Sequence, residues 1–181
     1  KWDAEAAEKA GFEHFMMKEI HEQPKAVRDT LNSVLVDGKL DMSAVGLSDE
    51  DIKKIDQICI VACGSAYHVG VAAQYVIEDL AQIPVRTELA SEFRYRKPLL
   101  SKNELVIIVS QSGETADSLA ALRLAKENGI KTLGIVNVVG SSIAREADNV
   151  FYTLAGPEIA VATTKAYSTQ LIAAYCLAIQ F

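Results

Sequence analysis

The sequence predicts an α/β fold: a doubly wound, mostly five-stranded parallel sheet flanked by helices and preceded by a helical lead-in. One observation behind this prediction is an alternation from residue 57 onward, where β-branched runs are separated by segments with helical spacing. Repeated β-α units of this size form right-handed, mostly parallel sheets. Another is the run 105–109, which is apolar at every position, as in strands that helices cover on both faces.

Residues 1–55 are expected to form the helical lead-in rather than a separate domain. Apolar residues recur there at helical spacing between charged ones, beginning with Phe12, Phe15, Met16 and Ile20. Pro24 interrupts the pattern, so we expect two short helices, kinked or broken at the proline and packed outside the main core. After polar connectors, Ser48 and Asp51 have the spacing of a cap for a short helix that ends near Ile55.

Residues 56–181 are expected to form the sheet domain. Its strands are short runs of mainly apolar and β-branched residues, at 58–62, 84–88, 105–109, 131–137 and 149–153. Helices are expected at 67–80, 91–95, 116–126, 141–146 and from about 164 onward. A helical segment therefore separates each strand from the next, which is the connection that parallel strands need.

Composition and charge exclude several classes of partner. Hydrophobic residues make up 50% of the 181-residue chain, which is enough for a sizeable core. The formal net charge of −6 argues against nucleic acid and anionic membranes as main partners. The longest apolar run, 171–179, is far shorter than the roughly 20 residues that span a bilayer. Because a surface helix normally shows a polar face, this run is expected to pack against a second chain, as a homodimer, or against a further domain.

The three cysteines, Cys59, Cys63 and Cys176, lie in apolar segments and are odd in number, which favours reduced thiols in a cytoplasmic protein. Their spacing is not that of a zinc site, so we assign no metal. The acidic N-terminus lacks the hydrophobic core of an export signal. Because the chain starts in a polar stretch and stops inside an apolar one, we expect it to be a piece of a longer protein.

The strand 105–109 runs directly into the turn 110–115, Ser-Gln-Ser-Gly-Glu-Thr. Ligands of parallel sheets gather beyond the carboxyl ends of the strands. This turn offers hydroxyls, a side-chain amide, a glycine that permits close backbone approach and the N-terminus of a helix. We therefore interpret it as a phosphate cradle. The alternative is that Thr115 or Ser112 only caps the following helix.

Two further segments can reach the same edge of the sheet. The first strand ends in Cys63-Gly64-Ser65, another glycine-bearing hydroxyl turn, for which a plain turn capped by Ser65 is the alternative. The segment 158–166 follows the last strand, and a loop with a capping box is its alternative interpretation. The chain has neither a P-loop lysine nor a Gly-x-Gly-x-x-Gly motif, so nucleotide binding of those kinds is disfavoured. The histidines receive no role.

Four motifs occur in order along the chain: 63–67 (Cys-Gly-Ser-Ala-Tyr), 91–96 (Ser-Glu-Phe-Arg-Tyr-Arg), 110–117 (Ser-Gln-Ser-Gly-Glu-Thr-Ala-Asp) and 161–166 (Val-Ala-Thr-Thr-Lys-Ala). With them, the chain resembles the sugar isomerase (SIS) domain family. More narrowly, it looks like the first of the two SIS domains in the glutamine:fructose-6-phosphate aminotransferases, the glucosamine-6-phosphate synthases. The segment 17–24 (Met-Lys-Glu-Ile-His-Glu-Gln-Pro) is similar to the piece that joins the glutaminase domain of those enzymes to their isomerase half.

The resemblance implies a set of binding residues. The phosphate of a sugar would be held by polar side chains of the two turns, namely Ser65, Ser110, Gln111, Ser112 and Thr115. The sugar would be bordered by Val161 and Thr163, with Gly64 and Gly113 as supporting backbone. Two departures from the family pattern occur. The first turn, usually Thr-Ser, is Ser65-Ala66 here and loses a hydroxyl, whereas Thr163 replaces a serine and keeps one.

The resemblance also implies an activity for the whole protein. In the family, ammonia from glutamine is passed to open-chain fructose-6-phosphate, and proton transfer between the first two carbons gives glucosamine-6-phosphate. The family's catalytic Glu, Lys and His lie in the second SIS domain and the C-terminal tail, and its glutaminase nucleophile is an N-terminal cysteine. We therefore expect no catalytic residue and no cofactor in this chain. Its expected partners are the sugar phosphate and those further domains.

Two alternatives stay open. The SIS domain also resembles the effector-binding modules of sugar-responsive transcription regulators, although the acidic lead-in does not look like a DNA-binding helix-turn-helix. A single-domain phosphosugar isomerase is the other alternative. It would need its own base in this chain, with Glu114, Glu158 or a histidine as the candidates.

Overall fold

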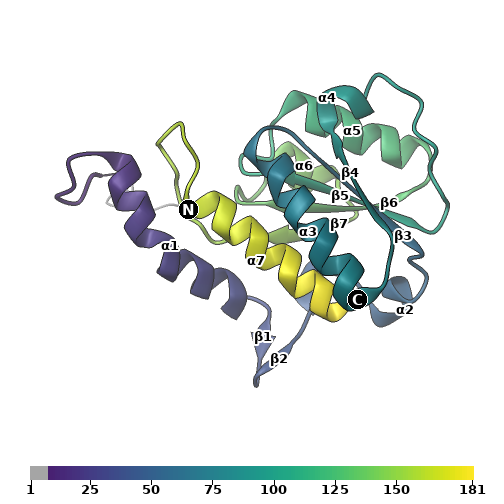
Figure 1. Cartoon of the computed structure of the whole chain (residues 1–181), viewed down its shortest axis with the longest axis horizontal. Helices are drawn as coiled ribbons and strands as arrows, with labels where there is room; N and C mark the ends of the chain where they lie inside the picture. Colours follow the sequence, from purple (N-terminus) through teal and green to yellow (C-terminus); the bar gives the residue numbers. More distant parts are fainter. Residues whose placement is uncertain (1–7) are drawn as a thin grey trace.

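A computed structural model describes residues 8–181, and Figure 1 shows a sheet between layers of helices. The strands of this sheet are β3 (Gln57–Ala62), β4 (Val85–Leu89), β5 (Glu104–Ser110), β6 (Lys131–Val136) and β7 (Asn149–Tyr152). Their order is β4-β3-β5-β6-β7, and every neighbouring pair is parallel. The predicted fold class is confirmed, and the strand ends differ from the expected ones by a single residue.

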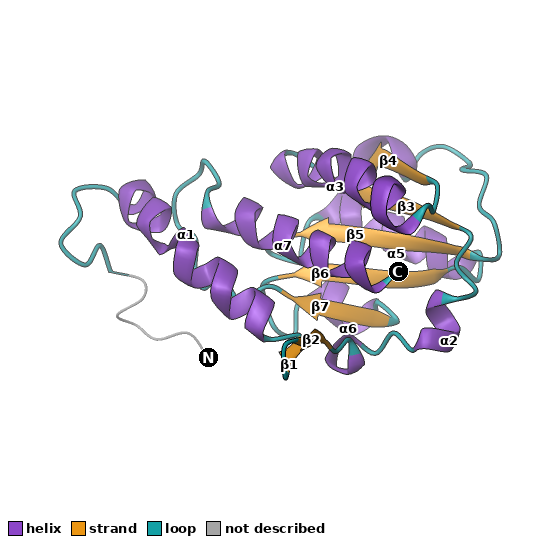
Figure 2. Ribbon diagram, turned by 60° about the horizontal axis from the view of Figure 1, so that its bottom comes forward, coloured by secondary structure: helices purple, strands orange, loops and turns teal. Residues whose placement is uncertain are grey.

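Helices cover both faces of the sheet (Figure 2). One face carries α3 (Ser65–Ala81) and α7 (Lys165–Gln180). The other face carries α4 (Ala90–Phe93), α5 (Ala116–Glu127) and α6 (Ser142–Glu146). Along β3, Ile58 and Ile60 belong to the first of these cores and Cys59 and Val61 to the second, because side chains alternate across a strand. All 7 residues of β5 are buried, which explains its unbroken apolar run.

The strand order reverses between β3 and β5, since β4 lies on one side of this pair and β6 and β7 on the other. The register pairs Ala62 of β3 with Val109 of β5, so both strands end at the same level. In doubly wound sheets, ligands bind in the crevice beyond the carboxyl ends of the strands at such a reversal. The two hydroxyl turns that follow β3 and β5 therefore lie at the expected place.

One helix occupies the stretch around Pro24 where two short helices were expected. α1 (Phe15–Asn32) runs without interruption through Pro24, so the prediction of two short helices is wrong. A proline lacks the N–H that would bond to the carbonyl four residues earlier, which here is that of Ile20. The Gln23 side chain donates to this carbonyl instead, with 3.3 Å between Nε2 and the oxygen. The Gln23 side chain therefore replaces the backbone N–H that the proline lacks, so the Ile20 carbonyl keeps a hydrogen-bond partner.

The buried face of α1 also differs from the expected one. Figure 1 shows α1 alongside α7, outside the helices that contact the sheet. The buried side of α1 includes the charged residues Lys18 and Glu19, whereas Met16 and Ile20 are 41% and 38% exposed. The apolar periodicity predicted the helix correctly but not the side that faces the protein.

A hairpin follows α1 where the sequence indicated a plain connector. It consists of β1 (Leu35–Val36) and β2 (Lys39–Leu40), which pair antiparallel. The turn residues Asp37 and Gly38 have φ values of 51° and 76°. Two successive residues of positive φ are what a two-residue hairpin turn requires, and Asp-Gly is a preferred sequence for it.

A 3-10 turn and a short helix, η2 (Ser43–Val45) and α2 (Asp49–Ile52), lead into the sheet. The predicted cap is confirmed, because Ser48 Oγ accepts a hydrogen bond from the Asp51 N–H at 3.2 Å. The Asp51 carboxylate also forms an ion pair of 2.8 Å with Lys131 Nζ at the start of β6. This contact ties the lead-in to the sheet.

The apolar run 171–179 forms the second half of α7 and is covered mainly by the chain itself. Ala173 and Leu177 are fully buried against α3 and the sheet, and Ile179 is exposed. The homodimer was expected because this run was thought to be uncovered. The structure removes that reason, and no observation tests the homodimer, which stays a prediction. Within residues 8–181, no helix is both long enough and apolar enough to cross a membrane.

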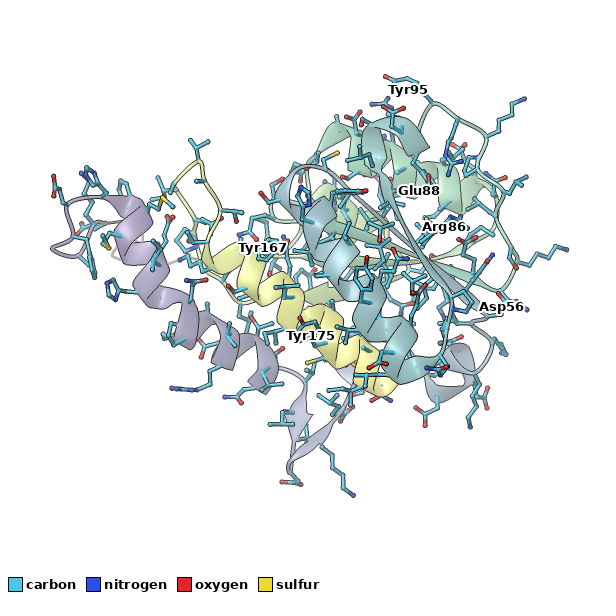
Figure 3. The ribbon with its side chains drawn as sticks, in the orientation of Figure 1. Asp56, Arg86, Glu88, Tyr95, Tyr167 and Tyr175 are labelled. Atoms are coloured by element: carbon cyan, nitrogen blue, oxygen red, sulfur yellow. The ribbon has the colours of Figure 1, made fainter. Side chains whose placement is uncertain are left out.

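Charged side chains line the edge strand β4. Arg86 and Glu88 both come from β4 (Figure 3), and Arg86 Nε lies 3.0 Å from Glu88 Oε1. Arg86 also forms an ion pair of 2.6 Å with the buried Glu104 on β5, two strands away. Burial raises the pKa of Glu104, and it raises the pKa of the neighbouring Cys59 thiol to about 12. Charges at a sheet edge disfavour pairing with another chain.

Candidate functional site

A cavity of about 330 Å³ opens beyond the carboxyl ends of β3 and β5. Its lining comes from the turns after these strands, from the segment after β7 and from α7. The lining residues are Cys63, Ser65, Ala66, Val109, Ser110, Gln111, Ser112, Thr115, Glu158, Ala160, Val161, Thr163 and Gln170. All seven side chains that the family resemblance implies for sugar-phosphate binding are among them, although they come from three distant parts of the sequence.

The turn after β5 is held by hydrogen bonds of its own hydroxyls. Ser110 Oγ accepts from the Gly113 N–H at 3.1 Å and lies 3.1 Å from Thr115 Oγ1. Ser112 Oγ accepts from the Glu114 N–H at 3.1 Å. These bonds curl the backbone tightly between β5 and α5, which leaves the hydroxyls grouped at one end of the cavity.

Simple helix capping does not explain these hydroxyls. Thr115 occupies the N-cap position of α5, but its side chain makes no capping hydrogen bond. Ser112 bonds within the turn and not to the first turn of the helix. In the first turn, Gly64 and not Ser65 is the N-cap of α3, so Ser65 is not a cap either. The capping alternatives therefore lose their support for both turns.

Both supporting glycines have backbones that favour glycine. Gly113 has a φ of +67°, and a Cβ atom there would lie 2.1 Å from Ser141 Oγ. Gly64 has a φ of 57° and a ψ of −135°, a combination that residues with a side chain rarely adopt. The close approach of Gly113 to Ser141 brings the turn against α6, and the Gly64 conformation directs the chain sharply from β3 into α3.

Gln111 contributes a polar group without a partner. Its Oε1 atom is buried and accepts no hydrogen bond within the described part of the chain. Its backbone carbonyl accepts from the Asn137 N–H at 3.2 Å, which fixes the turn against the end of β6. Buried polar groups are nearly always hydrogen-bonded, so this oxygen is an exception in a residue that lines the cavity.

Among residues 8–181, the cavity lining contains one charged residue, Glu158, and no lysine or arginine. Both oxygens of Glu158 are engaged: Oε1 accepts from Thr163 Oγ1 at 2.7 Å, and Oε2 accepts from the N–H groups of Thr164 and Ala166 at 3.1 and 3.0 Å. Glu158 therefore caps the N-terminus of α7 from outside the helix, and the expected capping box is not formed, because the N-cap Thr164 makes no side-chain capping bond. An anion in the cavity would be held by hydroxyls, amides and helix N-termini rather than by a cation.

The other candidate bases lie away from the cavity. Glu114 Oε1 accepts from the Ser142 N–H at 2.8 Å, and the hydrogen bonds from Ser142 lower the pKa of this exposed carboxyl. His14 lies beside Glu13, His21 stacks on Phe12 and His68 makes an edge contact with Tyr67. None of these groups lines the cavity. Among residues 8–181, no cluster of His, Cys, Asp and Glu could hold a metal ion.

Residues 94–97 form a small basic cluster whose two arginines are engaged in ion pairs. Arg94 pairs with Asp117 of α5 at 2.6 Å, and Arg96 pairs with Glu88. Asp117 Oδ1 also raises the pKa of the Arg94 guanidinium through this hydrogen bond. The cluster does not line the cavity, so it has no place in direct ligand contact.

Sequence reasoning missed several residues of the cavity. Gln170 is 3% exposed and lines the cavity from α7. The signal for it was a polar side chain within an otherwise apolar helix. Ala160 and Cys63 also contribute, and neither residue type carries a recognisable signal.

The family profile of the SIS domain matches residues 51–180. The chain is 58% identical to the glutamine–fructose-6-phosphate aminotransferase (isomerizing) of Caldanaerobacter subterraneus subsp. tengcongensis and 59% identical to that of Clostridium acetobutylicum. Each alignment covers 100% of this chain and 30% of the relative, so the chain spans less than a third of these relatives. The C-terminal domain of glucosamine-fructose-6-phosphate aminotransferase from Francisella tularensis matches with a TM-score of 0.90 and 43% identity, over 96% of this chain and 49% of that one. The predicted resemblance is confirmed.

Proposed function

The chain belongs to the SIS domain family, and from this premise we propose that its cavity binds a sugar phosphate. The observation that carries the proposal is the meeting of two hydroxyl turns and two helix N-termini, those of α3 and α5, at one cavity. Free N–H groups at helix N-termini and neutral hydroxyl donors bind phosphate without a cation. The alternative of capping alone leaves this convergence without a reason.

The proposal gives each part of the cavity a role. The turn 110–115 receives the phosphate through Ser110, Ser112, Thr115 and the amide of Gln111, with Ser65 adding a hydroxyl from the first turn. The sugar extends toward Val161 and Thr163, which line the cavity from the segment after β7. Gly64 and Gly113 permit the two sharp turns that bring the donors together.

We further propose that this chain is the sugar-phosphate-binding part of the isomerase half of an enzyme that makes glucosamine-6-phosphate from fructose-6-phosphate and glutamine. The support is the similarity over the whole chain to aminotransferases of that name, with 58% identity. The described residues also place no free base in the cavity, since Glu158 is fully hydrogen-bonded and no histidine lines it. Under this proposal the protein is cytoplasmic and homodimeric, and glutaminase and second SIS domains supply the chemistry.

The alternatives receive less support. A single-domain isomerase needs a base in this cavity, but Glu114 lies outside it and Glu158 caps α7. Within residues 8–55, the lead-in forms one long helix, a small hairpin, a 3-10 turn and a four-residue helix, not the pair of packed helices that reads a DNA groove.

The decisive experiment replaces Ser112, whose hydroxyl lies at the cavity. The Ser112→Ala variant is expected to lose one charge-assisted hydrogen bond to the phosphate, about 1.5–3 kcal/mol or roughly tenfold to hundredfold in affinity. Calorimetric titration with fructose-6-phosphate, and separately with fructose, measures this loss. Fructose is expected to bind neither protein measurably, because it lacks the phosphate.

Ser101→Ala is the matched control. Ser101 Oγ accepts a bond from the N–H two residues later, at Asn103, in the same way as Ser112 does, but it lies outside the cavity. Its loss is expected to leave the affinity for fructose-6-phosphate unchanged. Equal affinity of wild type and Ser112→Ala for the phosphorylated sugar would refute the phosphate cradle.

A further inference from the structure

The segment that borders the sugar side of the cavity is held from outside the sheet domain. We call residues 158–163 the rim loop; three of its members after Glu158, namely Ala160, Val161 and Thr163, line the cavity. The rim loop belongs to no helix or strand. Its backbone therefore depends on contacts with its neighbours for its position.

Helix α1 supplies the main contact. The side chain of Glu19 accepts hydrogen bonds from two successive backbone N–H groups of the rim loop. Its Oε1 atom lies 2.6 Å from the Ile159 nitrogen and 3.2 Å from the Ala160 nitrogen. Glu19 is 2% exposed, so these are buried, charge-assisted bonds. The chain separation between the partners is about 140 residues, and the next residue after Ala160 borders the sugar side.

Ion pairs also join α1 to α7 at this junction. Lys165, the first residue of α7, is 3% exposed and pairs with Glu22 of α1 at 2.6 Å. Lys18, also buried, lies 3.6 Å from the same Glu22 carboxylate. The junction therefore contains two cations and two carboxylates. One carboxylate, Glu22, joins the helices to each other, and the other, Glu19, reaches the rim loop.

Only one side of this contact lies within the residues that the SIS profile matches. The SIS profile begins at residue 51, whereas Glu19 lies in the lead-in. A carboxylate that is buried at such a junction costs free energy unless its bonds are made, so its two bonds to the rim loop fix the loop and α1 in one relative position.

We propose that Glu19 is a positioning residue of the sugar site. Through it, α1 contributes to the shape of the pocket without lining it. Glu19 holds the rim loop where it borders the sugar, and occupation of the pocket in turn stabilises the seating of α1. The coupling is reciprocal, because two events that stabilise the same loop must favour each other equally. This inference rests on the proposed function and assigns to it a residue that does not touch the ligand.

The test separates the two halves of the ligand. Glu19→Ala removes both bonds to the rim loop and leaves the turn 110–115 untouched. The affinity for fructose-6-phosphate is expected to fall about tenfold, within the usual range of coupling between sites. The affinity for inorganic phosphate, followed by NMR shifts of the Gly113 amide, is expected to stay unchanged, because phosphate alone does not reach the rim loop.

Two further variants serve as controls. Glu19→Gln keeps an Oε1 acceptor at the same place, so it is expected to retain most of the affinity for fructose-6-phosphate. Thr30→Val removes another side-chain-to-backbone bond between α1 and the same connection after β7, where the neutral Thr30 Oγ1 accepts from the Leu154 N–H at 3.0 Å. Leu154 does not line the cavity, so this variant is expected to bind both ligands as wild type does.

The outcomes are distinct. Three results would each overturn the positioning role. The first is that Glu19→Ala binds fructose-6-phosphate as tightly as wild type does. The others are that Glu19→Ala loses equal affinity for fructose-6-phosphate and for phosphate, or that the Ala and Gln variants lose equal affinity for fructose-6-phosphate. Absence of fructose-6-phosphate binding by the wild-type chain would instead overturn the proposed function itself. If Glu19→Ala does not fold, amide exchange of the wild-type chain decides. Fructose-6-phosphate must then protect the Ile159 and Ala160 amides more than phosphate does, and equal protection by both ligands contradicts the inference.

Discussion

Replacing Gly113 by alanine tests the geometry of the cradle more severely than removing any of its hydroxyls. The residue sits in the turn with a φ of +67°, and its missing side chain leaves room for α6. A Cβ atom at this position would lie 2.1 Å from Ser141 Oγ and 2.6 Å from Ser141 Cβ. Rotation of the hydroxyl can relieve the first contact, but the second requires the backbone of the turn or of α6 to move.

The expected loss of stability has two parts. An L-residue in the left-handed region costs roughly 1–2 kcal/mol relative to glycine. Forcing extra volume into a packed site adds about 1–3 kcal/mol. The free energy of unfolding of Gly113→Ala is therefore expected to fall by about 2–5 kcal/mol, a large share of the total for a domain of this size. Because the strain is relieved by moving the turn, phosphate binding should be lost as well.

Urea unfolding with a matched glycine separates the two parts. Gly129 has a φ of +71°, but nothing lies within 4 Å of the position of its Cβ, so Gly129→Ala should lose only about 1–2 kcal/mol. Adding Ser141→Gly to Gly113→Ala removes the clash and should reduce its effect to the Gly129 level, measured against Ser141→Gly alone. Equal losses for Gly113→Ala and Gly129→Ala would refute the claim that close approach to α6 shapes the cradle.

Two predictions concern titratable groups. Iodoacetamide should label Cys63, which lines the cavity, before the buried Cys59 and Cys176. Fructose-6-phosphate should slow the labelling of Cys63. Peptide mass spectrometry that finds Cys59 labelled first would contradict this prediction. The Asp51 carboxylate has its pKa lowered from 3.8 to about 2, first by its hydrogen bond with Lys131 and then by Ser48. Its contribution to stability is therefore complete above about pH 4 and is lost as the pH falls toward about 2. Asp51→Asn should remove this part of the acid dependence, and an NMR titration midpoint near 4 in the wild type would count against it.

The sheet and the cradle could be predicted because their signals are local. An apolar run that ends in a hydroxyl turn and a helical pattern, as at 105–126, specifies strand, turn and helix within a short window. The parallel arrangement then brings the ends of neighbouring strands to one edge without knowledge of any contact. This is why Ser65 and Ser112 could be assigned to one place from the sequence, and the structure does bring both to one cavity.

The lead-in could not be predicted in the same way because its structure depends on distant partners. Periodicity indicated that apolar residues such as Met16 should be buried, yet the buried side carries Glu19, whose partners are amides of a loop about 140 residues away. Pro24 indicated a break, but the helix continues through it, and the Gln23 side chain bonds to the Ile20 carbonyl that the proline cannot pair with. The hairpin at Asp37 and Gly38 does have a local signal, because Asp-Gly is a preferred pair for a two-residue hairpin turn.

A cavity lined by neutral donors responds to its surroundings differently from one lined by arginines. Salt screens charges separated by more than about 8 Å at physiological ionic strength, but it has little effect on hydrogen bonds at contact distance. The strength with which such a pocket retains a phosphate ester should therefore change little with ionic strength. The association rate should respond differently, because a chain with a net charge of −6 repels a doubly negative phosphate ester as it approaches. Added salt weakens that repulsion. It should therefore raise the association rate of the ester while leaving its dissociation rate nearly unchanged.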